Sequence, residues 1–341
     1  MVLVLIPILR VHNMIKFREC KDESLVEGVF VDDKNCLNPD NALSVERTDF
    51  GWLLYVHIVN IPGCLLEFSD IMSSLEKRMH FSDAGRGRLF SKQAFNELYD
   101  GNTLPALTLR ASFTPAGQVL DSNLAPTRLS YNKPLSRVDF KDVRDILGAP
   151  PKHLGRKERM ICDLFELAQV LQKRRAKLGA ICGSLDGLFY DWLSPKEFSP
   201  GVFLVREIRF WADYVLTRLA KKHDAQILYR VQRGPMRQNL LKSAEKIRSI
   251  FEGDSGASDS EKIERLISEL LKSRKVLHWA RMSMSRNSLR NAGIGFPCYA
   301  PFLAPRRKLI DLYNLSTLAE ALEIQQNPLK GFDKRKICRM G

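Results

Sequence analysis

The stretch that most constrains the fold is residues 52–58, whose sequence is WLLYVHI. A continuous, mostly apolar run of this length, rich in β-branched and aromatic side chains, is typical of a buried strand. Residues 29–31, 104–113, 118–120 and 129–131 have a similar composition. A Pro-Ala-Gly turn at 115–117 separates two of these stretches, and Gly117 can adopt a positive φ there. The first half of the chain is therefore predicted to be mostly β.

The second half has helical spacing instead. Residues 157–177 place Leu164, Leu167 and Leu171 on one face and end in basic residues, which the helix dipole favours. Residues 203–222 repeat this pattern, and two more helices are predicted over 236–252 and 260–275. Neither an internal repeat nor a change of composition marks a second domain. We predict a single α+β domain with a β-rich first half and a helical second half.

The charge of the chain indicates a polyanionic partner. Lys and Arg number 53 against 39 Asp and Glu, which gives a formal charge of +14 over 341 residues. Phosphates brought to Lys and Arg release condensed counterions, so a basic surface attracts nucleic acid. The alternative is a basic soluble protein, or a basic subunit of a larger complex, without that partner.

The cysteines and the N-terminus bear on the compartment. Seven scattered cysteines form no CxxC pair, which argues against a zinc knuckle, and their odd number fits a reducing compartment. Small buried side chains are the simplest role for all of them. The apolar start MVLVLIPIL is too short to span a bilayer and lacks a secretory signal's basic segment. It is either a weak organellar transit peptide or, at least as plausibly, an edge strand or a segment that covers the core, and no membrane partner is expected.

An acidic loop follows the first predicted strand. Residues 29–46 have the sequence VFVDDKNCLNPDNALSVE, in which oxygen-bearing side chains crowd together at Asp32, Asp33, Asn38, Asp40 and Asn41. Closely spaced oxygen ligands on a loop are how proteins hold Mg²⁺. Asp and Asn also cap their own backbone in Asx turns, and composition alone favours that structural role.

A basic stretch lies near the other end of the chain. No acid occurs between Glu269 and Asp311, whereas nine Lys and Arg occur there, interleaved with aromatic residues. Cations that follow phosphates and rings that stack on bases suit a single-stranded nucleic acid. The alternative is a solvated helix face beside ordinary core aromatics.

Together, these two regions resemble the RNB domain, the catalytic domain of the ribonuclease II/R family of 3′→5′ exoribonucleases. The family has a strand followed by an Asp, then a D-x-D-D-A-L-S ending, then a strand that ends H-I-A-D. This chain has Asp32, then NPDNALSVE at 38–46, then VHIVN at 56–60, with the spacing kept. The resemblance is closest to the bacterial and organellar branch.

The resemblance also implies that the metal site is degenerate. In the family, four acids bind the ions that activate water and clamp the scissile phosphate. Two of these positions remain acidic here, Asp32 and Asp40, whereas Asn38 and Asn41 replace the other two, and Asn60 replaces the Asp of H-I-A-D. Carboxylates must offset the repulsion between two divalent ions, so a pair of them predicts at most one weak Mg²⁺ site.

The basic stretch resembles the family's T-S-P-I-R-R-Y-x-D-L element, as YAPFLAPRRKLIDL at 299–312. The first family Arg, which contacts the scissile phosphate region, corresponds to Arg307. The catalytic candidates are therefore Asp32, Asp40 and Arg307.

Shorter matches at 164–181 and 228–235 extend the resemblance to about residues 28–325, with an N-terminal extension at 1–27 and a basic tail at 326–341. The RNA-binding candidates are Arg281, Arg286, Arg290, Tyr299, Arg306 and Lys308.

Departures from the family leave three functions open. The region after H-I-A-D survives only faintly at 76–81, so the family's base-clamping aromatic is unassigned. We expect the chain to lack the family's flanking oligonucleotide-binding modules. We expect a catalytically impaired protein that binds single-stranded RNA within an RNA-processing or ribonucleoprotein complex whose partners supply those modules. The alternatives are an active Mg²⁺-dependent 3′→5′ exoribonuclease and a basic scaffold without RNA affinity. The expected location is the cytoplasm or an organelle matrix, in a mitochondrion or plastid.

Overall fold

The computed structural model describes residues 24–32, 36, 40–67, 103–130, 137–180, 199–231, 283–285, 287, 290–291, 293–332, 334 and 337. Some sequence predictions lie outside these residues. They are the helices over 236–252 and 260–275, the apolar N-terminus, the faint match at 76–81, and the candidates Asn38, Arg281 and Arg286.

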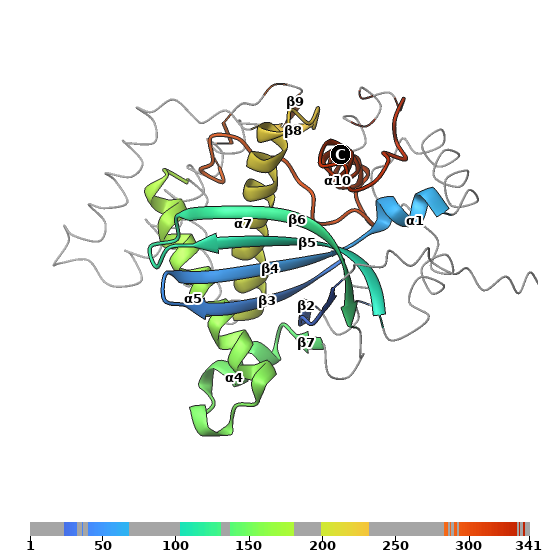
Figure 1. Ribbon diagram of the computed structural model, residues 1–341. Coiled ribbons are helices and arrows are strands. Elements are labelled where there is room, and N and C mark those ends of the chain that lie inside the picture. Colours follow the sequence, from blue (N-terminus) through green and yellow to red (C-terminus); the bar gives the residue numbers. More distant parts are fainter. Residues whose placement is uncertain are drawn as a thin grey trace, which may run out of the picture.

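A five-stranded curved sheet dominates the first half (Figure 1). Its strand at 51–59 contains the predicted run, and Leu54, Val56 and Ile58 are fully buried there. Gly117 has a φ of +75° in the turn that joins two strands, as predicted. The edge strand β1 is parallel to its neighbour and the other pairs are antiparallel. The order is β1 (Leu25–Val26), β6 (Val119–Ser130), β5 (Thr103–Phe113), β4 (Gly51–Val59) and β3 (Asn41–Thr48).

Two long helices, α5 (Arg156–Lys177) and α7 (Pro200–Lys222), pack against one face of this sheet (Figure 1). Their bounds agree with the helices predicted over 157–177 and 203–222. Helix α7 begins earlier because the Ser199 hydroxyl accepts a hydrogen bond from the Val202 amide and a proline occupies the first turn. The first core lies between these helices and alternate residues of β3, β4 and β5. The short α4 (Asp142–Gly148) and a 3₁₀ turn (Pro151–His153) precede α5.

A second core joins the sheet to two further helices, α1 (Ile61–Glu67) and α10 (Leu309–Ala321). Strand β2 (Phe30–Asp32) pairs in parallel with β7 (Arg137–Asp139), and β8 (Tyr229–Val231) pairs with β9 (Ser283–Ser285). This arrangement positions the site: the acidic loop connects β2 to β3, and residues 299–308, which we call the basic segment, lead into α10. The mixed architecture confirms the predicted α+β domain.

The other face of the sheet carries a row of polar side chains. His57 Nε2 lies 2.9 Å from Ser44 Oγ, and His57 Nδ1 lies 2.9 Å from Thr108 Oγ1. Thr108 in turn lies 2.7 Å from Thr127 Oγ1. Burial lowers the pKa of His57 to about 4, so the imidazole is neutral at pH 7. Among the described helices, none is long and apolar enough to cross a membrane.

Candidate nucleic-acid interface

The acidic loop and the basic segment meet at Asp40. This residue lies directly before β3, and only 2% of its side chain is exposed. Arg307 Nε donates a hydrogen bond to Asp40 Oδ2 at 2.6 Å, and Arg306 Nε lies 3.6 Å from Asp40 Oδ1. We call Asp40, Arg306 and Arg307 the Asp40 cluster. Two candidates from opposite ends of the chain, Asp40 and Arg307, are thus in direct contact.

Two asparagines near the Asp40 cluster, Asn41 and Asn60, use their amides as hydrogen-bond donors. Asn41 Nδ2 donates to the Leu303 carbonyl at 2.9 Å, which ties β3 to the basic segment. Asn60 Nδ2 donates to Gln325 Oε1 at 2.9 Å, and Asn60 Oδ1 accepts from the Gly63 amide in the first turn of α1. An ionised carboxylate has no proton to donate, so an Asp at either position would lose one of these bonds.

Buried side chains of α7 and α10 form hydrogen bonds with the basic segment and fix its position. Asp213 of α7 accepts hydrogen bonds from the Tyr299 hydroxyl and the Phe302 amide, both at 2.8 Å. Asp311 of α10 accepts one from the Ala304 amide, also at 2.8 Å. Arg209 lies between these carboxylates, 3.9 Å from Asp213 Oδ2 and 3.3 Å from Asp311 Oδ1. We call Arg209, Asp213, Tyr299 and Asp311 the buried aspartate network.

Burial decides the electrostatics of this network. It raises the pKa of Asp213 to about 7, against the opposing effect of Arg209, and Asp311 adds to the rise. Burial likewise raises the pKa of Asp311, while Arg209 and Lys308 oppose it. Burial acts to lower the pKa of Arg209, but the two carboxylates together raise it above its ordinary value. The single guanidinium of Arg209 therefore compensates the charge of two buried carboxyl groups, Asp213 and Asp311.

Further cations lie close to the Asp40 cluster. Partial burial lowers the pKa of Lys308; Asp311 opposes this effect, and the positive charges of Arg209 and Arg230 add to it. Arg209 in turn is close enough to Asp40 for that carboxylate to contribute to raising the pKa of Arg209. Arg209, Arg230 and Asp213 were not among the residues predicted from the sequence. The available signal was the spacing of four residues between Arg209 and Asp213, which lets the two side chains meet on one side of α7.

Asp32 ends β2 and lies beside a cysteine. The Cys36 thiol is hydrogen-bonded to Asp32, and burial raises its pKa to about 11, helped by that carboxylate. Cys36 is only half-buried, unlike Cys64 and Cys298, which are buried as predicted. Cys162 is also half-buried, so the prediction of seven buried cysteines is wrong for Cys36 and Cys162.

The charges around Asp40 oppose a divalent cation. Among the described residues, no group of three or more His, Cys, Asp or Glu side chains could hold a metal ion. Unit charges about 4 Å apart interact by about 4 kcal/mol at an effective dielectric constant near 20. Two arginines lie within 4.0 Å of Asp40, so they oppose the approach of a divalent cation. The single weak Mg²⁺ site on Asp32 and Asp40 stays a prediction.

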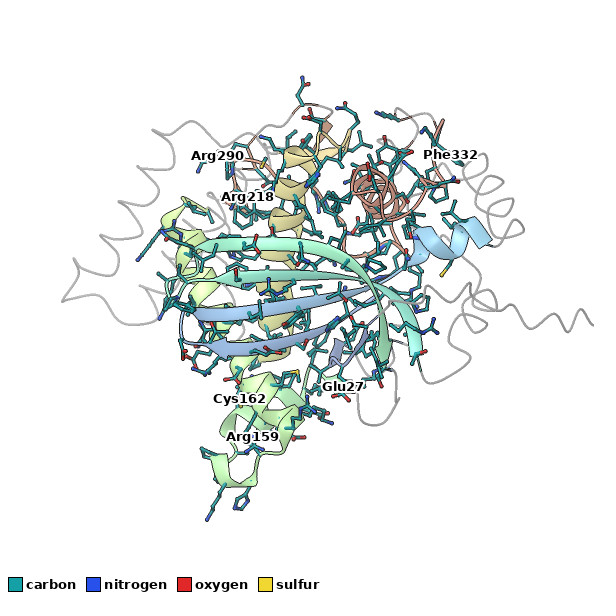
Figure 2. All side chains as sticks on the ribbon, viewed as in Figure 1. Glu27, Arg159, Cys162, Arg218, Arg290 and Phe332 are labelled. Atoms are coloured by element: carbon teal, nitrogen blue, oxygen red, sulfur yellow. The ribbon has the colours of Figure 1, made fainter. Side chains whose placement is uncertain are left out.

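The remaining RNA-binding candidates lie in different surroundings. Tyr299 is 2% exposed, so its ring is enclosed by the core and does not present a face to a base. Arg290 Nη2 donates to the Leu178 carbonyl, beyond the end of α5 (Figure 2). Arg306 is mostly buried, whereas 53% of the Arg307 side chain is exposed. Of the cluster arginines, Arg307 is therefore the one that presents its guanidinium to solvent.

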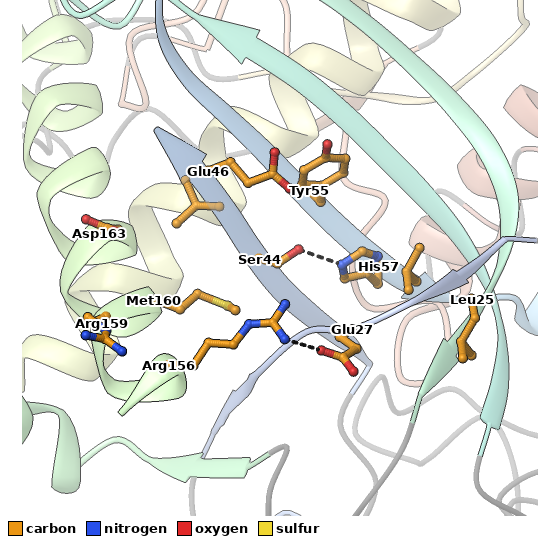
Figure 3. Close-up of a pocket in the computed structure, with 12 residues that line it drawn as sticks. Leu25, Glu27, Ser44, Glu46, Tyr55, His57, Arg156, Arg159, Met160 and Asp163 are labelled. Atoms are coloured by element: carbon orange, nitrogen blue, oxygen red, sulfur yellow. Dashed lines mark hydrogen bonds and ion pairs between the residues drawn. The ribbon is translucent and has the colours of Figure 1, made fainter. Parts of the chain in front are cut away.

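A pocket of about 780 Å³ lies elsewhere, between the N-terminal part of α5 and the polar face of the sheet (Figure 3). Ser44, Tyr55 and His57 contribute to its lining, and Arg156 pairs with Glu27 across it at 3.2 Å. None of its lining residues belongs to the Asp40 cluster. Its size alone therefore does not make it the candidate site.

Comparison with known families defines the class. Residues 24–324 match the model of the RNB domain, and the chain belongs to this family. No curated protein sequence matches the chain.

Solved structures with the same fold differ widely in sequence. RNase R of Mycoplasma genitalium, solved with ribose-methylated single-stranded RNA, matches 93% of this chain and 53% of its own, with a TM-score of 0.65 and 16% identity. Yeast Ssd1, described as a pseudonuclease, matches 93% of this chain and 42% of its own, with a TM-score of 0.56 and 16% identity. An active-site mutant of the Dss1 exoribonuclease from Candida glabrata matches 94% and 45%, with a TM-score of 0.65 and 15% identity. The chain thus spans about half the length of these relatives, and the likeness shows the fold alone.

Proposed function

We propose that the chain is an RNA-binding protein of the RNB fold with impaired catalysis, acting as a subunit of an RNA-processing or ribonucleoprotein complex. The observation that carries this proposal is the contact between Asp40 and Arg307. The carboxylate best placed to hold a metal is instead engaged by a protein cation. The asparagines at 41 and 60 support the proposal, because they work as hydrogen-bond donors inside the fold.

Single-stranded RNA is the proposed partner. Arg209, Arg230, Arg306, Arg307 and Lys308 lie near one another although they come from α7, β8 and the segment before α10. Clustered Arg and Lys bind phosphates, and the formal charge of +14 supports a polyanionic ligand. The RNase R relatives were solved with single-stranded and double-stranded RNA, which is consistent with this partner.

A protein complex is the second part of the proposal. The relatives extend well beyond the region that matches this chain. We propose that the chain acts on RNA together with partner proteins, in the cytoplasm or in an organelle matrix. The existence of the pseudonuclease Ssd1 in the same fold class is consistent with a role that does not need hydrolysis.

An active Mg²⁺-dependent 3′→5′ exoribonuclease is the second candidate, and one observation favours it. Asp40 Oδ1 is buried and accepts no hydrogen bond within the described structure. A buried carboxylate oxygen without a donor is costly, and a cation would satisfy it. Arg306 Nε is 3.6 Å from this oxygen, too far for a hydrogen bond but close enough to compensate its charge.

The salt dependence of RNA affinity tests the proposed binding. Fluorescence anisotropy with a labelled single-stranded RNA should give a Kd that rises steeply with salt. Arg307→Ala should weaken binding and flatten the slope by about 0.7, the value for one lost phosphate contact on a single strand. Arg47→Ala is the matched control, because Arg47 is exposed to a similar degree but pairs with Asp163 and Glu166 instead of the Asp40 cluster. A wild-type affinity that does not change with salt would contradict the proposal.

A further inference from the structure

Arg307 has the geometry of an anchored phosphate receptor. Its Nε is bonded to the buried Asp40, whereas no contact with the described residues is recorded for its two terminal Nη groups. More than half of the side chain is exposed. A guanidinium fixed at one edge and open at the other can donate two parallel hydrogen bonds to a phosphate.

The charge around Asp40 also favours an anion over a cation. One carboxylate faces two guanidinium groups, and Arg209 and Lys308 add positive charge nearby, partly offset by Asp311. A divalent cation entering here would meet the arginines first. A phosphate would meet the free edge of Arg307.

We propose that Arg307 stands in place of a metal ion at Asp40, so that the Asp40 cluster binds RNA phosphates without a divalent cation. Asp40 then has two effects on the ligand. It orients Arg307 through the hydrogen bond to Nε, and its negative charge competes with the RNA phosphate for the same guanidinium. This inference rests on the proposed RNA-binding function and specifies how one phosphate is held.

Asp40→Asn separates this proposal from a metal site, because the amide oxygen can still accept the bond from Arg307 Nε while the negative charge is gone. RNA affinity, measured by anisotropy at fixed ionic strength, should rise about fivefold as one repelling charge is removed. Wild-type affinity in EDTA should equal that in Mg²⁺. A metal ligand would behave in the opposite way: Asp40→Asn would weaken binding in Mg²⁺, and EDTA would weaken the wild type. Either of these results overturns the proposal.

Glu207→Gln is the matched control for removing a buried negative charge. Glu207 is also fully buried and paired with an arginine, Arg175, at 2.7 and 3.0 Å, but none of its recorded contacts involves the basic segment. Its RNA affinity should stay unchanged. An equal gain in Glu207→Gln and Asp40→Asn would show a general charge effect and would count against the proposal.

Two further measurements test the proposal if Asp40→Asn does not fold or if the wild type binds no RNA. If Asp40→Asn does not fold, as judged by circular dichroism, Arg307→Gln should lower RNA affinity equally in EDTA and in Mg²⁺, and unchanged affinity overturns the proposal. If the wild type binds no RNA, the proposed RNA-binding function is wrong, but the inference about Arg307 can still be tested. The test is the change in melting temperature on adding pyrophosphate or Mg²⁺. Stabilisation by pyrophosphate that Arg307→Gln abolishes supports it. No pyrophosphate shift, or an Mg²⁺ shift that Asp40→Asn abolishes, contradicts it.

Discussion

Asn41 connects β3 to the basic segment through one hydrogen bond. Its amide donates to the Leu303 carbonyl at 2.9 Å, and Asn41 is the first residue of β3. An acid at this position would keep the shape of the side chain and remove the donor. It would therefore break a contact between β3 and the segment that carries Arg306 and Arg307.

Asn41→Asp is predicted to destabilise the protein by about 1–3 kcal/mol, because the Leu303 carbonyl loses its donor and faces a carboxylate instead. The free energy of unfolding from urea titration measures this effect. Asn41→Ala, which removes the donor without adding charge, should cost less. A stability equal to that of the wild type in Asn41→Asp would show that the bond to Leu303 is unimportant.

His57 predicts a pH dependence of stability. Its folded pKa of about 4 is below the ordinary value, so the unfolded chain takes up a proton first as the pH falls through about 6.5. Stability is therefore highest above pH 6.5, decreases toward pH 4, and by this group alone is about 2 kcal/mol lower at pH 5 than at pH 7. The difference in unfolding free energy between the wild type and His57→Gln should shrink by that amount at pH 5. A difference that is the same at both pH values would contradict a neutral, buried His57.

At the scale of elements, α7 and α10 determine where the basic segment lies. Each contributes one buried carboxylate that accepts a backbone amide of this segment, Asp213 from Phe302 and Asp311 from Ala304. Arg209 connects the two helices through these carboxylates. The sequence predicted α7 well, because its apolar residues repeat at helical spacing, but the same pattern makes an internal Asp resemble an ordinary surface position.

Asp213→Asn should loosen this segment in a pH-dependent way. The folded carboxyl keeps its proton up to about pH 7 and the unfolded one loses it near 3.8, so the contribution of Asp213 to stability falls as the pH rises through this window. The stability advantage of the wild type over Asp213→Asn should therefore decrease between pH 5 and pH 8. Urea titrations at these pH values measure it.

Hydrogen exchange provides the control for this prediction. The Phe302 amide donates to Asp213, so exchange in peptides covering residues 299–308 should be faster in Asp213→Asn. Glu207→Gln alters another buried acid of α7, one paired with Arg175, and should leave these peptides unchanged. Equal effects of both variants would mean that α7 is weakened as a whole and that Asp213 has no special role in positioning the segment.

At the scale of the molecule, the sequence predicted the architecture better than the site. The run at 52–58 and the spacing in 157–177 and 203–222 predicted β4, α5 and α7, because burial leaves a periodic pattern in the sequence. The resemblance grouped Asp32, Asp40 and Arg307 as catalytic candidates, whereas the direct contact between Asp40 and Arg307 is seen only in the structure. Tyr299 looked like an RNA contact and is enclosed in the core, because a one-dimensional pattern does not show which aromatics face inward.

The most direct test of the central claim is whether the protein binds single-stranded RNA without degrading it. The 341-residue chain would be incubated with 3′-labelled RNA in Mg²⁺ and in Mn²⁺, with binding and mononucleotide release followed in the same samples. We expect salt-sensitive binding of intact RNA and no release of mononucleotides in either metal. Metal-dependent, processive release of mononucleotides that disappears in Asp40→Asn would contradict it.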